Sequence, residues 1–109
     1  NDWIVISLGA PGLVKRVEVD TAHFKGNYPD RCSVQGALIK EKTSLDILTD
    51  NCNWQELMSQ QKLEMDKIHT FEGSVIENIG AISHVRLNIY PDGGVSRFRL
   101  FGELYNHGF

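Results

Sequence analysis

The sequence has few of the features that mark the more specialised classes of protein. Only two of its 109 residues are cysteine and no C-x-x-C pair occurs, so no disulfide framework is indicated. No apolar run approaches the roughly 18 residues that a membrane-spanning helix needs. The net charge of −3 provides no general attraction to nucleic acid or to an anionic membrane. We therefore expect one soluble globular domain with neither nucleic acid nor membrane as a partner.

The two cysteines, Cys32 and Cys52, are expected to be reduced thiols of an intracellular protein, because secreted domains of this size are usually richer in cysteine. A single disulfide between them is the alternative. Cys32 begins an apparent strand, where a thiol is more often a small core residue than a nucleophile. The chain starts with Asn1 rather than methionine, and Trp3 already lies in an apolar run, which indicates a piece of a longer polypeptide.

Recognisable catalytic motifs are also missing. The chain contains no phosphate-binding glycine loop, no G-x-S-x-G elbow and no H-E-x-x-H pair. His69, His84 and His107 show no metal-ligand spacing, so the sequence predicts no complete metal site. Any chemistry must come from residues that the fold brings together.

Apolar residues recur mostly with period two rather than 3.6, which predicts β-strands. The expected strands are residues 3–8, 13–19 and 32–39, with weaker candidates at 54–58 and 67–71. Gly9-Ala10-Pro11-Gly12 predicts a turn after the first strand, and a loop is expected over 21–31. Lys15 falls on the apolar face of the second strand and weakens the pattern there. Residues 40–53 are ambiguous. Short strands between Gly/Pro turns favour an all-β sandwich or barrel.

The strongest local pattern lies in Ser83–Gly102, where two alternating runs flank Pro91-Asp92-Gly93-Gly94. Asp-Gly favours a type I′ turn with positive φ at both central residues. We therefore predict a hairpin in which Asn88 faces Arg97 and Arg86 faces Arg99. Its apolar face would hold Val85, Leu87, Ile89, Phe98 and Leu100. Its polar face would hold His84, Arg86, Asn88, Arg97 and Arg99.

Three arginines on one small face need something negative opposite them. One interpretation is structural, with acidic residues of a neighbouring strand or solvent as the partner. The functional interpretation is an anion site, since a guanidinium group can bind a carboxylate through two parallel hydrogen bonds. Phosphate and nucleic acid are less favoured, because the chain is acidic and lacks interleaved exposed aromatic residues.

A second polar group, Asp20 and His23, lies where a predicted strand enters a loop. The pair could act as a general base and its orienting carboxylate if the chain bends between them. It could also supply two metal ligands, although a complete site needs more. The structural alternative is that Asp20 caps the loop backbone and His23 is a partly buried structural residue.

Three stretches resemble the allantoicase family. They are VEVDTAHFKGNYPDRCSVQG (residues 17–36), HVRLNIYPDGGVSRFRLFG (residues 84–102) and the opening DWIVISLGAPGLVKRV. The resemblance implies a jelly-roll β-sandwich of the galactose-binding-like type. It also implies two tandem repeats and a homo-oligomer. Residues 1–109 would then be one repeat, more similar to the second (C-terminal) repeat, with its opening strands missing before Asn1.

The reaction that the resemblance implies is hydrolysis of allantoate to ureidoglycolate and urea, in the cytoplasm or peroxisome. Because allantoate is a carboxylate with two ureido groups, we assign its carboxylate to Arg86, Arg97 and Arg99 and a ureido group to Asn88. Asp20 and His23 would activate water or protonate the departing urea. Some members of the family are associated with manganese, so this cofactor stays open. The alternatives are a non-catalytic jelly-roll module that binds a ligand and an allantoicase-like protein without turnover.

Overall fold

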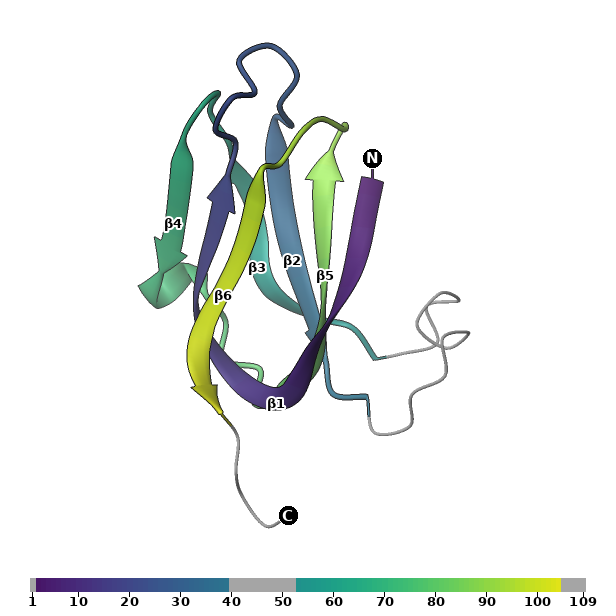
Figure 1. Cartoon of the computed structure of the whole chain (residues 1–109). Coiled ribbons are helices and arrows are strands. Elements are labelled where there is room, and N and C mark those ends of the chain that lie inside the picture. The colour runs from purple at the N-terminus through teal and green to yellow at the C-terminus, as the bar shows by residue number, and fades with distance from the viewer. Residues whose placement is uncertain (1, 40–52, 105–109) are drawn as a thin grey trace.

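The computed structural model describes residues 2–39 and 53–104 as one curled β-sheet that closes into a two-layered sandwich (Figure 1). One layer has the strand order β3-β2-β5-β1, and β1 continues into a second layer where it pairs with β4 and β6. A 3₁₀ turn, η1, follows β4. The elements are β1 (Asp2–Asp20), β2 (Arg31–Ala37), β3 (Gln55–Lys62), β4 (Ile68–Glu72), η1 (Gly73–Val75), β5 (Ile82–Tyr90) and β6 (Arg97–Leu104). The predicted all-β sandwich is confirmed.

The first strand belongs to both layers. Its residues 2–7 pair with β5, and after a register shift its residues 12–20 pair with β6 and, from Arg16 onward, with β4. Figure 1 shows β1 descending beside β5, bending at one end of the sandwich and rising between β4 and β6. Gly9 adopts a φ of +82° at the bend, which only glycine tolerates easily. The turn predicted at residues 9–12 is therefore wrong as a chain reversal, since the strand continues through it.

A β-bulge explains why Lys15 disturbed the alternation. Val14 pairs with Gly102 and Arg16 pairs with the next residue of β6, Phe101, so β1 carries one extra residue at position 15. A bulge of this kind moves the side chains on one side of it to the opposite face. Val14 consequently packs against the core while Lys15 is exposed.

The predicted hairpin between β5 and β6 is not formed. Both edges of β5 are occupied, one by β1 and the other by β2, and β6 pairs instead with the second half of β1. Residues 91–96 cross to the other layer along the 21–30 loop, where Gly94 N donates to Asn27 O at 2.8 Å and Ser96 N donates to Asp20 O at 2.7 Å. Gly93 has positive φ but Asp92 does not, so the type I′ turn is also wrong.

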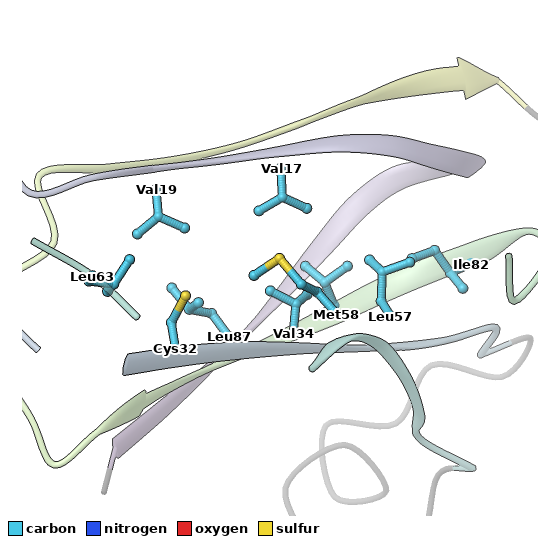
Figure 2. Packing of buried hydrophobic residues seen from close by; sticks show 10 residues of the cluster. Val17, Val19, Cys32, Val34, Leu57, Met58, Leu63, Ile82 and Leu87 are labelled. Atoms are coloured by element: carbon cyan, nitrogen blue, oxygen red, sulfur yellow. The ribbon is translucent and has the colours of Figure 1, made fainter. Parts of the chain in front are cut away.

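The side-chain faces within each of these strands are nevertheless as predicted. Val85 and Leu87 belong to the buried core, and Ile89, Phe98 and Leu100 pack against it. Figure 2 shows the two layers facing each other, with Val17 and Val19 of β1 opposite Val34 and Leu87. Each such side chain stabilises the fold by roughly 1.5–3 kcal/mol when fully buried. This shared core holds the layers together.

The remaining strand predictions differ mainly in their bounds. The predicted loop is observed over 21–30, and the strand predicted over 32–39 is observed as β2, which begins one residue earlier and ends two residues earlier. The weak candidate over 54–58 is part of β3, which continues to Lys62, and the candidate over 67–71 corresponds to β4. Residues 40–52, including Cys52, and His107 lie outside the described residues. Within the described ranges no helix is long and apolar enough to cross a membrane.

The close approach of β6 to β1 provides a test of this pairing. A Cβ atom at Gly102 would overlap the carbonyl oxygen of Leu13, whereas one at Gly26 would have no neighbouring atom within 4 Å. We expect Gly102→Ala to lower the free energy of unfolding by about 1–3 kcal/mol, because overpacking forces the backbone apart. Gly26→Ala should change it by less than about 0.5 kcal/mol. Chemical denaturation of the complete polypeptide measures both, and equal effects would contradict the pairing of β1 with β6.

Candidate functional site

Polar side chains collect on the outer face of the layer formed by β3, β2, β5 and the first half of β1. The core residues of β2 and β5 alternate with polar ones, so the polar side chains point away from the core. Strand register places Gln35 opposite Arg86, and Ser33 opposite Asn88. These four residues line a pocket of about 490 Å³. The complete lining is Trp3, Ser33, Val34, Gln35, Glu56, Gln60, Arg86, Asn88 and Tyr90.

A hydrogen-bonded network connects the floor of this pocket. Arg86 Nε donates to Gln35 Oε1 at 2.8 Å, and Asn88 Nδ2 donates to the same oxygen at 3.3 Å. Asn88 Nδ2 also lies 3.3 Å from Ser33 Oγ, to which it donates, and Ser33 Oγ is 3.1 Å from the hydroxyl of Tyr90. Asn88 is only 5% exposed. Because buried polar groups in a connected network restrain one another, these side chains are held in defined orientations.

Two indole rings flank the arginine of the pocket. The guanidinium carbon of Arg86 lies 5.5 Å from the ring centre of Trp3 and 5.4 Å from that of Trp54. Cation–π contacts of this length stabilise a guanidinium group that is partly removed from water. Glu56 is the acidic residue of the lining and lies opposite Gln35 on β3. The pocket therefore offers a positive group, neutral amides and one carboxylate at its side.

The structure brings together two of the four predicted substrate-binding residues. Arg86 and Asn88 share the pocket on β5, whereas Arg97 and Arg99 lie on β6, in the other layer, with exposed side chains. In register, Arg97 is opposite Asp20 and Arg99 is opposite Glu18. The predicted single patch of three arginines is therefore wrong, because it depended on a hairpin that does not form. Arg97 and Arg99 instead fit the structural interpretation, because an acidic residue of the neighbouring strand β1 lies opposite each of them.

The predicted catalytic pair lies outside the pocket. Asp20 Oδ1 accepts a hydrogen bond from Ala22 N at 2.7 Å, as a residue that caps a loop does. His23 has a φ of +73°, its backbone N donates to Asp66 Oδ1 at 2.9 Å, and its side chain is exposed. Within the described residues no hydrogen bond joins the two side chains. The capping role of Asp20 is thus observed, and catalytic roles for Asp20 and His23 stay predictions.

Three residues that line the pocket were not among the predicted site residues: Gln35, Ser33 and Trp3. Ser33 and Gln35 alternate with the buried Cys32 and Val34, which is the pattern that singled out Arg86 and Asn88. Applying the same alternation to this strand would have found them. Trp3 belongs to an apolar run, which by itself indicates burial, yet it is 43% exposed beside Asn88, its register partner.

The described residues do not form a metal site by themselves. No group of three or more His, Cys, Asp or Glu residues within 2–39 and 53–104 is arranged to hold a metal ion. Manganese therefore has no evident ligand set in this part of the chain, and no step of the chemistry is derived through it.

Cys32 is a core residue, as predicted. It is 0% exposed and free, and burial raises the pKa of its thiol from 9.0 to about 12. Because only the thiolate is a strong nucleophile, this cysteine is inert at neutral pH.

The raised pKa of Cys32 predicts how stability depends on alkaline pH. The unfolded thiol loses its proton near pH 9 and the folded one near pH 12, so the folded state binds more protons between these values. The contribution of Cys32 to stability is complete below about pH 9. It should fall by up to about 1.4 kcal/mol per pH unit above that. Denaturation of the wild-type protein and of Cys32→Ala across this range isolates the effect, and parallel pH profiles would contradict it.

Comparison with known proteins agrees with this architecture. Residues 1–105 match the family model of the allantoicase repeat. A probable allantoicase 2 of Burkholderia pseudomallei and a probable allantoicase of Stutzerimonas stutzeri are each 54% identical over 95% of the chain, which covers 31% of either relative. The crystal structure of allantoicase from Saccharomyces cerevisiae has a TM-score of 0.74 at 39% identity, covering 93% of this chain and 27% of that one.

The fold, a β-sandwich with an arginine- and amide-lined pocket on one outer face, is therefore that of a repeat unit found within longer polypeptides. The chain belongs to the allantoicase repeat family. It spans about 31% of the length of the curated relatives it matches.

Proposed function

We propose that the complete polypeptide containing this repeat hydrolyses allantoate to ureidoglycolate and urea. The family membership of the chain and the names of its relatives support the reaction. The observation that carries the proposal for this repeat is the pocket around Arg86, where a cation lies beside neutral amide groups. Allantoate has the complementary composition, with one carboxylate and two uncharged ureido groups.

In this proposal Arg86 attracts the substrate carboxylate. Its Nε is used by Gln35, and the two indoles restrict where the guanidinium plane can lie. A guanidinium group held in this way binds a carboxylate with little further loss of conformational freedom. Asn88 lies next to Arg86 along the same face of β5 and is placed to bond a ureido group.

The rest of the chemistry is proposed to need other parts of the polypeptide. Because the chain covers about a third of its relatives' length, a second repeat of the same polypeptide is an expected partner of this one. A homo-oligomer is expected only because the family resemblance implies it. Glu56 is the lining carboxylate that could exchange a proton with substrate, since Asp20 and His23 do not line the pocket. A manganese ion, if used, would require ligands from beyond the described residues.

The proposed activity is tested by urea release from allantoate by the complete polypeptide, with and without added manganese. Turnover in either condition supports the proposal. Binding of allantoate without any urea release in both conditions would instead identify a ligand-binding module and overturn the hydrolase.

The placement of the carboxylate is tested by comparing two arginines on opposite layers. We expect Arg86→Ala to raise KM for allantoate by roughly 10- to 100-fold, because a charged hydrogen bond is worth about 1.5–3 kcal/mol. Arg99→Ala removes the same charge from the other layer and should change KM less than about twofold. Steady-state urea assays measure both. If Arg99→Ala were the impaired variant, the carboxylate would have been assigned to the wrong layer.

A further inference from the structure

Two neighbouring carboxamides occupy the floor of the pocket, and the arginine beside them determines how both are oriented. Arg86 Nε can only donate a hydrogen bond, so the atom of Gln35 that lies 2.8 Å from it must be the oxygen. Asn88 then meets that same oxygen at 3.3 Å and must present its nitrogen. Rotating either amide by half a turn would place donor against donor or oxygen against oxygen.

With the two amides oriented in this way, one polar group of each makes no hydrogen bond within the described residues. Within residues 2–39 and 53–104, neither Gln35 Nε2 nor Asn88 Oδ1 forms a hydrogen bond, although both residues line the pocket. Neither atom is among the buried unpartnered ones, so both are reached by solvent. The pocket therefore presents a pair of N–H donors from Gln35 near a carbonyl acceptor from Asn88.

We infer that Gln35 and Asn88 together recognise the ureido group of the substrate, an inference that rests on the proposed function. A ureido group is planar and carries a carbonyl oxygen beside a terminal NH₂. Gln35 Nε2 would donate to that oxygen, and Asn88 Oδ1 would accept from the NH₂. A site that hydrogen-bonds a polar substrate group discriminates strongly against analogues that lack it, because its own polar atoms are then left unpaired.

Ser33 and Tyr90 serve this recognition as positioning residues. Ser33 Oγ accepts the second hydrogen bond of Asn88 Nδ2 and is itself bonded to the Tyr90 hydroxyl. With Nδ2 engaged by both Gln35 and Ser33, the carbonyl oxygen of Asn88 is held in one direction.

Three carboxylates of equal chain length test the contacts of Gln35 and Asn88 with the ureido group one after the other. N-carbamoylglycine carries the whole ureido group, and N-acetylglycine replaces its terminal NH₂ by methyl. Pentanoate lacks the carbonyl and the inner N–H as well, so the share of Gln35 in the second step is read from its variant. Their dissociation constants are measured by calorimetry on the complete polypeptide, so the result does not depend on turnover. For the wild type we expect each step down the series to weaken binding by about tenfold.

The variants assign each step to one residue. Asn88→Leu should reduce the ratio between N-carbamoylglycine and N-acetylglycine to near one and leave the next ratio intact. Gln35→Met should remove the preference for N-acetylglycine over pentanoate. It should reduce the first ratio only in part, because Ser33 still holds Asn88 Nδ2 when the Gln35 oxygen is lost. Gln61→Met is the matched control, because Gln61 lies on β3, donates to Ser59 O and does not line the pocket. It should keep both ratios.

The outcomes separate this inference from the proposed function. Equal binding of the three ligands by the wild type would overturn it, even if allantoate is hydrolysed. Unchanged ratios in folded Gln35→Met protein would overturn the role of Gln35. If the wild type discriminates at both steps but releases no urea, ureido recognition is supported and only the proposed hydrolysis is overturned. The wild-type series needs no substitution, so the inference stays testable if Asn88→Leu does not fold.

Discussion

The structure depends on β1 being hydrogen-bonded in both layers. Its first half forms one edge of the layer that contains β5, and its second half lies between β4 and β6. Because one strand is common to both sheets, their apolar faces close over the same core. The arrangement also occupies the edge of β5 that a hairpin partner would have used. β5 is thereby fixed between β1 and β2, with Arg86 at its centre.

The pocket follows from that position of β5. A strand with neighbours on both sides has cross-strand contacts in two directions, and those contacts supply Trp3 from β1 and Gln35 from β2. The side chains on the floor of the pocket orient one another through their hydrogen bonds. The guanidinium of Arg86 orients Gln35, which orients Asn88. The side chains that would meet a substrate are set by the fold before any ligand arrives, which reduces the entropic cost of binding.

The four predicted substrate-binding residues are divided between the two layers for a specific reason. Period-two alternation assigns a side chain to the inner or outer face of its own strand, and it did so correctly for Arg86, Asn88, Arg97 and Arg99. It says nothing of which strand lies beside which. The Asp-Gly turn signal was local, whereas the partner of each strand was decided by residues far away in the chain. Gln35 could have been found from its own strand, but its contact with Arg86 could not.

The amino-acid sequence by itself determined the all-β class, the core-facing residues and the family resemblance, because each is written in short-range patterns of residue type. Only the tertiary structure decided that β1 bends through both layers, that β6 pairs with it, and that Arg86 and Asn88 are separated from Arg97 and Arg99. Strand pairing is settled by the competition among all backbone edges for partners and by the burial of one common core. A local pattern of residue types cannot predict its outcome, because the competing strands are far apart in the sequence.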